Sequence, residues 1–134
     1  MPRAASHLVM ATADVPRITR FVSDAFGLAP VFENEMFSEF VLPSRFRIAF
    51  FVPVGASAAS FEAAASRQAI AVGLTVADVD AAYARIAALG DARGHVVSGP
   101  PKEHPWGEKS FLLTDPDGNR WEVTQAPPGD GMLV

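Results

Sequence analysis

The stretch GPPKEHPWGEKSFLLTDPDGNRWEVTQ, Gly99 to Gln125, says most about how this chain folds. Two runs that suit β-strands, Ser110 to Thr114 and Asn119 to Gln125, flank the sequence Asp115-Pro116-Asp117-Gly118. Proline presets a turn dihedral, aspartate caps a turn through its side chain, and glycine accepts a positive φ. The stretch therefore predicts a β-hairpin that closes on Asp115 to Gly118.

The last run of this hairpin alternates polar and apolar residues. Period-two alternation puts Glu122 on one face of the strand and both Trp121 and Val123 on the other. A carboxylate between apolar residues in mid-strand is costly to bury without a partner. Glu122 is therefore a candidate binding residue. The structural alternative is a bond to a basic side chain, for which the candidates are His7, Arg47 and Arg120.

The first half of the chain reads as a strand, a helix and further strands. His7 to Ala11 suits a strand, Asp14 offers an N-cap, and apolar residues at helical spacing predict a helix over 15–26 that ends at Gly27. Further strands are predicted over 30–33, 37–42 and 45–52.

The second half repeats this order. A strand over 69–76 precedes a helix that Asp78 caps and Gly90 ends. A short strand over 95–98, a break at 99–101 and the closing hairpin follow. Two similar units of about half the chain predict an α+β fold of two βαβββ modules. We expect them to form one curved mixed sheet with the helices on its outer face.

The two halves are joined by a segment of different composition. Residues 54–68 are rich in alanine, serine and glycine, which suits a linker, and a weak helix over Ser60 to Arg67 is the alternative. We therefore expect one domain over 1–134, with module 1 at about 5–53, the linker at 54–68 and module 2 at about 69–126.

The composition excludes several classes of protein. The 134 residues are 49% hydrophobic, which suits one domain with a real core rather than a disordered chain. A net charge of -4 argues against nucleic-acid binding. No apolar run approaches the roughly 20 residues of a membrane span, so no membrane partner is expected. The lack of cysteine is consistent with a cytoplasmic location.

The closing hairpin also resembles a known family. With a Pro-Trp-Gly loop before it and a glutamate four residues after the turn glycine, it resembles the closing segment of the vicinal oxygen chelate superfamily. That group includes glyoxalase I, bleomycin-resistance proteins, fosfomycin-resistance enzymes and extradiol dioxygenases. The module order and the Asp-helix-Gly spacing in both halves extend the resemblance from His7 to Gln125. It implies a site on the concave sheet face and a homodimer, because the family often assembles its sites across two chains.

The resemblance carries over only half of the family's metal ligands. His7, seven residues before Asp14, and Glu122 match two ligand positions, whereas the other two fall at Ala49 and Ala71. Transition metals in such sites need three or four protein ligands. We therefore expect no metal or other cofactor. The alternative is a divalent metal ion that His7, Glu122 and ligands outside these positions would hold. His95 and His104 are expected to lie outside the site.

The resemblance and the strand alternation together predict a ligand pocket. Small residues beside aromatic ones and a few polar groups are typical of such pockets. For Arg47, a plain salt bridge is the alternative to binding a ligand carboxylate. The predicted pocket residues are His7, Phe37, Arg47, Ala49, Phe51, Ala71, Gly73, Trp106 and Glu122.

Three functions remain open at this point. The first is a glyoxalase-like or bleomycin-resistance-like protein that binds a small, partly apolar ligand without a complete metal site. The second is a metal-dependent lyase or dioxygenase of the same superfamily. The third is a structural or regulatory dimer without a ligand. The sequence favours the first, and it leaves open whether the protein catalyses a reaction.

Overall fold

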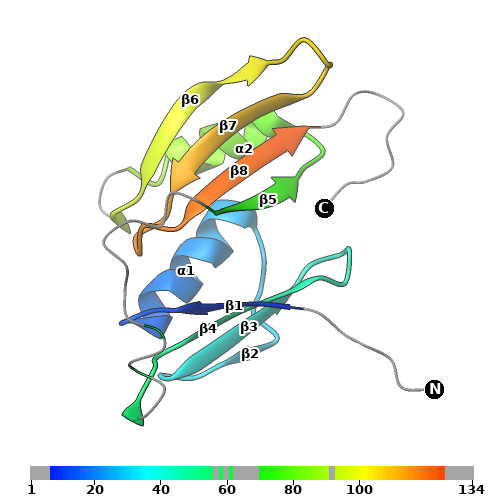
Figure 1. Cartoon of the computed structure of the whole chain (residues 1–134). Coiled ribbons are helices and arrows are strands. Elements are labelled where there is room, and N and C mark those ends of the chain that lie inside the picture. Colours follow the sequence, from blue (N-terminus) through cyan, green and yellow to red (C-terminus); the bar gives the residue numbers. More distant parts are fainter. Residues whose placement is uncertain (1–6, 56–57, 59–60, 62–69, 91–92, 126–134) are drawn as a thin grey trace, which may run out of the picture.

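The structure is a computed structural model that describes residues 7–55, 58, 61, 70–90 and 93–125. Two units follow each other along the chain, each a strand, a helix and three strands (Figure 1). The α+β fold of two βαβββ modules is therefore confirmed. Module 1 contains β1 (His7–Ala11), α1 (Val15–Phe26), β2 (Phe32–Glu33), β3 (Phe37–Val41) and β4 (Arg47–Phe51). Module 2 contains β5 (Ala71–Thr75), α2 (Val79–Ala87), β6 (Val96–Glu103), β7 (Lys109–Thr114) and β8 (Arg120–Gln125).

Each module forms its own four-stranded sheet. The strand orders are β1-β4-β3-β2 and β5-β8-β7-β6, and the two sheets share no strand pairing. In each sheet the first strand of the module runs parallel to the last, and the remaining pairs are antiparallel. Within the described residues, two sheets thus replace the one continuous curved sheet that the sequence led us to expect.

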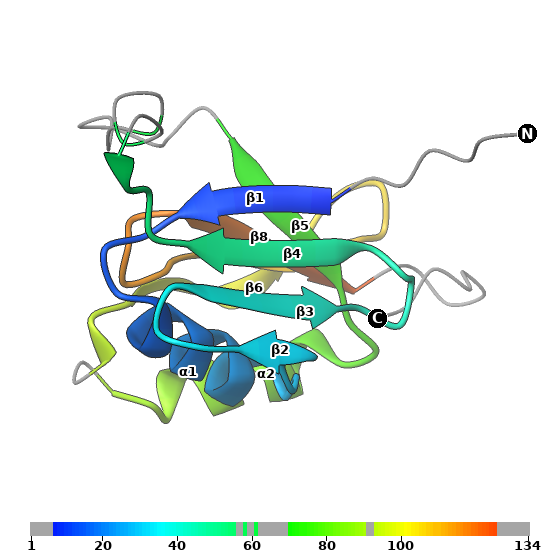
Figure 2. The same cartoon turned by 90° about the horizontal axis from the view of Figure 1, so that it is seen from below.

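The reason for the two sheets lies in the helices. α1 buries a wide stripe of side chains, which includes Ile18, Phe21, Val22 and Ala25. It lies between the two sheets, and α2 packs beside it against the second sheet (Figures 1 and 2). Phe26 of α1 reaches module 2, where its ring centroid lies 4.9 Å from that of Trp121. A helix on the outside of one sheet would leave part of this stripe in water, which is unfavourable.

Both helices begin where the sequence predicts. Asp14 and Asp78 have extended backbones, and their carboxylates accept from the N–H groups of Arg17 and Ala81. These are N-caps. At the other end of α1, Gly27 has φ 67° and donates its N–H to the Ser23 carbonyl, as expected for a left-handed C-cap.

A single hydrophobic core joins the modules. Side chains from α1, α2 and the inner faces of both sheets form one cluster, in which Trp121 is fully buried. The inner faces take alternate residues, such as Ile48 and Phe50 in β4 and Trp121 and Val123 in β8. Period-two geometry then turns the other residues of these strands away from the core.

Two predicted boundaries are wrong. The second helix was expected to end at Gly90, but α2 ends at Ala87 with Ala88 as its C-cap. The expected break at 99–101 lies inside β6, which runs on to Glu103. Its pairing with β7 shifts register between Ser98 and Lys102, so the irregular sequence is absorbed as a bulge and does not end the strand. The linker over 54–68, with the alternative helix over Ser60 to Arg67, lies mostly outside the described residues.

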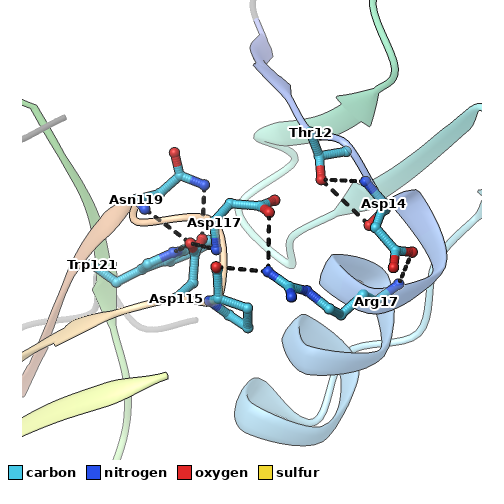
Figure 3. Close-up of polar contacts among 8 residues, drawn as sticks. Thr12, Asp14, Arg17, Asp115, Asp117, Asn119 and Trp121 are labelled. Atoms are coloured by element: carbon cyan, nitrogen blue, oxygen red, sulfur yellow. Dashed lines mark hydrogen bonds and ion pairs between the residues drawn. The ribbon is translucent and has the colours of Figure 1, made fainter. Parts of the chain in front are cut away.

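The β7–β8 turn holds the modules together through polar contacts (Figure 3). Arg17 of α1 donates to the Pro116 carbonyl at 2.7 Å, and its guanidinium lies 3.6 Å from the Asp117 carboxylate. The buried Asp115 carboxylate accepts four hydrogen bonds, from the N–H groups of Asp117 and Asn119, the Asn119 amide and the Trp121 indole. This turn therefore fixes one corner of the interface between the modules.

The described residues contain two helices, α1 and α2. Neither of them has the length and apolar composition that crossing a membrane would require.

Candidate functional site

Each sheet has an outer face that points away from the helices. On the first sheet, the register pairs His7 with Arg47 and Phe37 with Phe51, so these four residues share that face. We call this the β4 outer face. Ala49 lies on it between Arg47 and Phe51, and its small side chain is buried by its neighbours. Five of the predicted pocket residues therefore share one surface.

Arg47 forms an ion pair on the β4 outer face. One terminal nitrogen of its guanidinium lies 2.9 Å and 3.1 Å from the two carboxylate oxygens of Glu39 on β3. Its Nε is buried and has no hydrogen-bond partner among the described residues. Arg47 thus forms the salt bridge that the sequence left open, with Glu39 as the partner, and its binding to a ligand stays a prediction.

The second sheet carries the remaining predicted residues of the strands. The register pairs Glu122 of β8 with Gly73 on one side and with Leu112 on the other. We call this surface the β8 outer face, and Ala71 also lies on it. Glu122 is exposed, and none of the described residues forms a hydrogen bond or ion pair with its carboxylate. A Cβ built on Gly73 meets nothing within 4 Å, so the space beside Glu122 is open.

A shallow hollow of about 390 Å³ lies on the β8 outer face next to Glu122. Its lining includes Leu112, Ser110 and His104, and the His104 Nε2 lies 2.7 Å from the Ser110 hydroxyl. The His104 ring stacks on Trp106, with centroids 4.7 Å apart and planes at 4°. Trp106 is 65% exposed and contacts the lining residue His104, and its role at the rim of a ligand pocket stays a prediction.

Of the described residues that line this hollow, Glu122 alone is predicted from the sequence, and those that sequence reasoning missed include His104 and Ser110. His104 was expected outside the site, because the sequence places it in a proline-rich loop. Since β6 continues to Glu103, His104 begins the turn that leads into β7, beside Ser110. Alternation along β7 would have found Ser110, which lies two residues before Leu112 on the same face.

His7 and Glu122 do not form one site within a single chain. They lie on the outer faces of different sheets, both turned away from the shared core, and no described hydrogen bond or ion pair joins them. The resemblance assigns both residues to one site, and such a site would require a second copy of the chain, whose outer face would lie against that of the first.

The residues at the four metal positions do not fit a metal centre. The register pairs His7 with Arg47 in module 1 and Ala71 with Arg120 in module 2, so these two pairs are equivalent. Ala49 and Glu122 each lie two residues after the arginine of the pair, so Ala49 corresponds to Glu122. Alanine supplies no ligand atom, and two ligands are too few for a stable site. Within the described part of the chain, no group of three or more His, Cys, Asp or Glu side chains could hold an ion.

A comparison with known families agrees with this architecture. The family described as Glyoxalase/Bleomycin resistance protein/Dioxygenase superfamily matches residues 4–123. The chain belongs to this superfamily. The match covers both modules and ends within β8, directly after Glu122. No curated protein matches the chain at a significant level.

Solved structures of this superfamily have the same fold. A glyoxalase-related enzyme from Fulvimarina pelagi is 22% identical with a TM-score of 0.75, over 99% of this chain and 96% of that one. A glyoxalase/bleomycin resistance protein from Albidiferax ferrireducens is 19% identical with a TM-score of 0.70, over 92% and 98%. A genomically encoded fosfomycin resistance protein from Listeria monocytogenes is 19% identical with a TM-score of 0.69, over 96% and 97%. At these identities the likeness shows the fold alone.

Proposed function

We propose that this protein is a homodimer that binds a small, partly apolar ligand between the β4 outer face of one chain and the β8 outer face of the other. The observation that carries this proposal is the placement of the predicted pocket residues. All those in strands lie on the two outer faces, whereas the inner faces are filled by the core.

The exposed apolar side chains support the dimer. Val9 and Val41 on the first sheet and Leu112 on the second are 36% to 40% exposed, and Trp106 is 65% exposed. Apolar surface that clusters on a sheet face marks an interaction site. A two-fold dimer would cover both faces at once, because each chain contributes one of each kind.

The polar groups on these faces suggest the kind of ligand. Glu122 is an acceptor without a partner among the described residues, and the buried Nε of Arg47 is a donor without one. Glu122 would accept from an amine or hydroxyl, and Arg47 would donate to an oxygen of the same molecule. The phenylalanines and Leu112 would contact its apolar part.

The binding proposal is tested with a thermal-shift screen of small aromatic acids and cationic compounds. A ligand at 100 times its Kd stabilises the folded state by roughly 2.7 kcal/mol, which raises the melting temperature visibly. The shift should be lost in Glu122→Gln and kept in Arg45→Gln, a change in the β3–β4 turn. If no compound shifts the wild type, or if both variants keep the shift, binding at this site is excluded.

The dimer is tested separately by light scattering. We expect a species of about twice the chain mass of 14.2 kDa at micromolar concentration. A single species of 14.2 kDa would exclude the dimer. The cytoplasmic location that the cysteine-free composition favours belongs to this proposal too, and cell fractionation tests it.

The alternative is a metal-dependent lyase or dioxygenase. It would need a third ligand, and His104 is the histidine that shares a hollow with Glu122. Its Nε2 is hydrogen-bonded to Ser110 and its ring is stacked on Trp106, so both contacts would have to change. Metal analysis of protein purified without chelator separates the two functions. Stoichiometric metal that His7→Ala removes would favour the enzyme.

A further inference from the structure

A second hollow, of about 460 Å³, lies away from both outer faces. It is formed where the first half of α1 meets the loop that precedes β6. Its lining includes Asp14, Arg17, Arg20, Phe21 and Arg93. The volume is ample for a small ion with some of its water. Because the proposed dimer uses the outer faces, this hollow would remain open to solvent.

The lining is rich in arginine. Three of the nine arginines of the chain line it, and among the described lining residues Asp14 is the one acid, although the whole chain has a net charge of -4. Arg20 is exposed and has no ion pair or hydrogen bond within the described residues. A guanidinium presents five N–H donors in a planar fork that matches the oxygens of a carboxylate or phosphate.

The other two arginines are held in place by neighbouring groups. Arg17 contacts the Pro116 carbonyl and Asp117 (Figure 3), and Arg93 lies 2.7 Å from the Asp24 carboxylate. These contacts use one terminal nitrogen of each guanidinium, which leaves Nε and the second terminal nitrogen outside the ion pairs. The pairing fixes the positions of both cations without using all their donors, and such preorganisation favours binding.

The acids around the hollow set the kind of anion. Asp117 and Asp24 pair with Arg17 and Arg93, whereas Arg20 is the cation of the hollow without an ion pair among the described residues. An ion with several oxygens can bond to more than one guanidinium at once. The end of α1 adds little, because Asp14 already accepts from the N–H of Arg17 at 3.1 Å.

We propose that the hollow between Arg17, Arg20 and Arg93 binds a small oxyanion whose several oxygens bond to more than one guanidinium, either a phosphate group or a dicarboxylate. The proposal does not depend on the ligand site of the outer faces. It assigns a second site, on the helix side of the molecule, which connects the two modules through α1 and the loop before β6.

The test is a titration of the ¹⁵N-labelled protein followed by NMR, with inorganic phosphate in one arm and malonate in the other. Sodium chloride at matched ionic strength is the reference. We expect saturable shifts at Arg20 and Gly94 in at least one arm, and the arm tells which oxyanion is bound. Arg20→Gln should weaken binding about tenfold or more, since a charge-assisted hydrogen bond is lost.

The matched control is Arg45→Gln, which removes one positive charge from the β3–β4 turn and should leave the affinity unchanged. Arg20 is exposed and without a partner among the described residues, so Arg20→Gln keeps the fold. Arg93→Gln should also weaken binding. Shifts that never saturate, that chloride reproduces, or that Arg20→Gln leaves unchanged would overturn the proposal.

Discussion

The two modules contain the same turn, built in two chemically different ways. In β3–β4, the Leu42 N–H donates to the Phe46 carbonyl and the Arg45 N–H donates to the Leu42 carbonyl. The β7–β8 turn has the same two bonds. The Asp115 N–H donates to the Asn119 carbonyl, and the Gly118 N–H donates to the Asp115 carbonyl. Leu42 packs into the hydrophobic core, whereas Asp115 is buried in a network of hydrogen bonds. The same turn is thus stabilised by apolar packing in module 1 and by buried hydrogen bonds in module 2.

The outer faces differ in the same way. At equivalent registers, module 1 has Glu39 across from Ala49, and module 2 has Leu112 across from Glu122. The acid of module 1 is neutralised by Arg47, whereas the acid of module 2 has no ion pair among the described residues. Duplicated modules therefore supply the same scaffold twice, and the unpaired acid marks the face on which module 2 would bind a ligand.

The largest expected effect concerns the two buried turn residues. Asp115→Ala would leave the Trp121 indole, the Asn119 amide and two backbone N–H groups without their acceptor, at an expected cost of about 3–5 kcal/mol of unfolding free energy. Leu42→Ala loses packing alone and should cost about 2–3 kcal/mol. Urea unfolding at fixed protein concentration measures both. A smaller cost for Asp115→Ala than for Leu42→Ala would contradict the polar account of this turn.

The pH dependence of stability should separate the turns next. Burial raises the pKa of Asp115 above its ordinary value, although the hydrogen bonds from Trp121 and Asn119 oppose this. The unfolded chain then releases the proton near pH 3.9, before the folded protein does. The contribution of Asp115 to stability is full below that pH, and it is lost as pH rises through the raised pKa. Across this pH window, the difference in unfolding free energy between wild type and Asp115→Asn should fall. The difference between wild type and Leu42→Ala should stay constant, because both of these proteins contain Asp115.

A smaller effect is expected at the residues of positive φ. Arg45 has φ 76° and Gly118 has φ 85° at the same position of the two turns. Gly118→Ala meets nothing within 4 Å, so its cost comes from the dihedral alone, about 1–2 kcal/mol. Arg45→Gly relieves the same strain, but glycine also raises the conformational entropy of the unfolded chain. The unfolding free energy should therefore rise by only about 0.5 kcal/mol. Thermal melting of both variants checks the signs, and a loss in Arg45→Gly would contradict the equivalence.

The smallest effects on stability are expected at the two acids of the outer faces. Glu39→Gln weakens a partly exposed ion pair and should cost less than about 1 kcal/mol. Glu122→Gln breaks no described contact, so it should leave the melting temperature of the free protein unchanged. The order should reverse for ligand affinity, measured by calorimetry with a compound from the screen. If Glu39→Gln and Glu122→Gln weakened ligand binding equally, the conclusion that the unpaired acid Glu122 binds the ligand and the paired acid Glu39 does not would be wrong.

The sequence predicts the local parts of this molecule well. Asp14, Gly27 and Asp78 act through bonds to neighbouring residues, so their pattern alone locates the helix ends. Strand alternation assigns Glu122 and Trp121 to opposite faces for the same reason. Such short-range signals do not depend on how the modules pack.

The sequence does not predict the long-range parts. Whether the modules join edge to edge or pack through their helices depends on contacts such as Phe26 with Trp121, which are distant in the chain. The pairing of Arg47 with Glu39 depends on the β3–β4 register. The position of His104 depends on the bulge in β6, where the glycine and prolines at 99–101 led us to predict the end of a strand.

The central claim is that His7 of one chain meets Glu122 of another. Because the chain has no cysteine, His7→Cys and Glu122→Cys each introduce a single thiol, which a short thiol-reactive crosslinker can join. We predict a covalent dimer when the two variants are mixed and allowed to exchange, and none with either variant alone, since two-fold symmetry separates like residues. A mixture that stays monomeric on a denaturing gel, or a double variant that crosslinks only within one chain, would contradict the account.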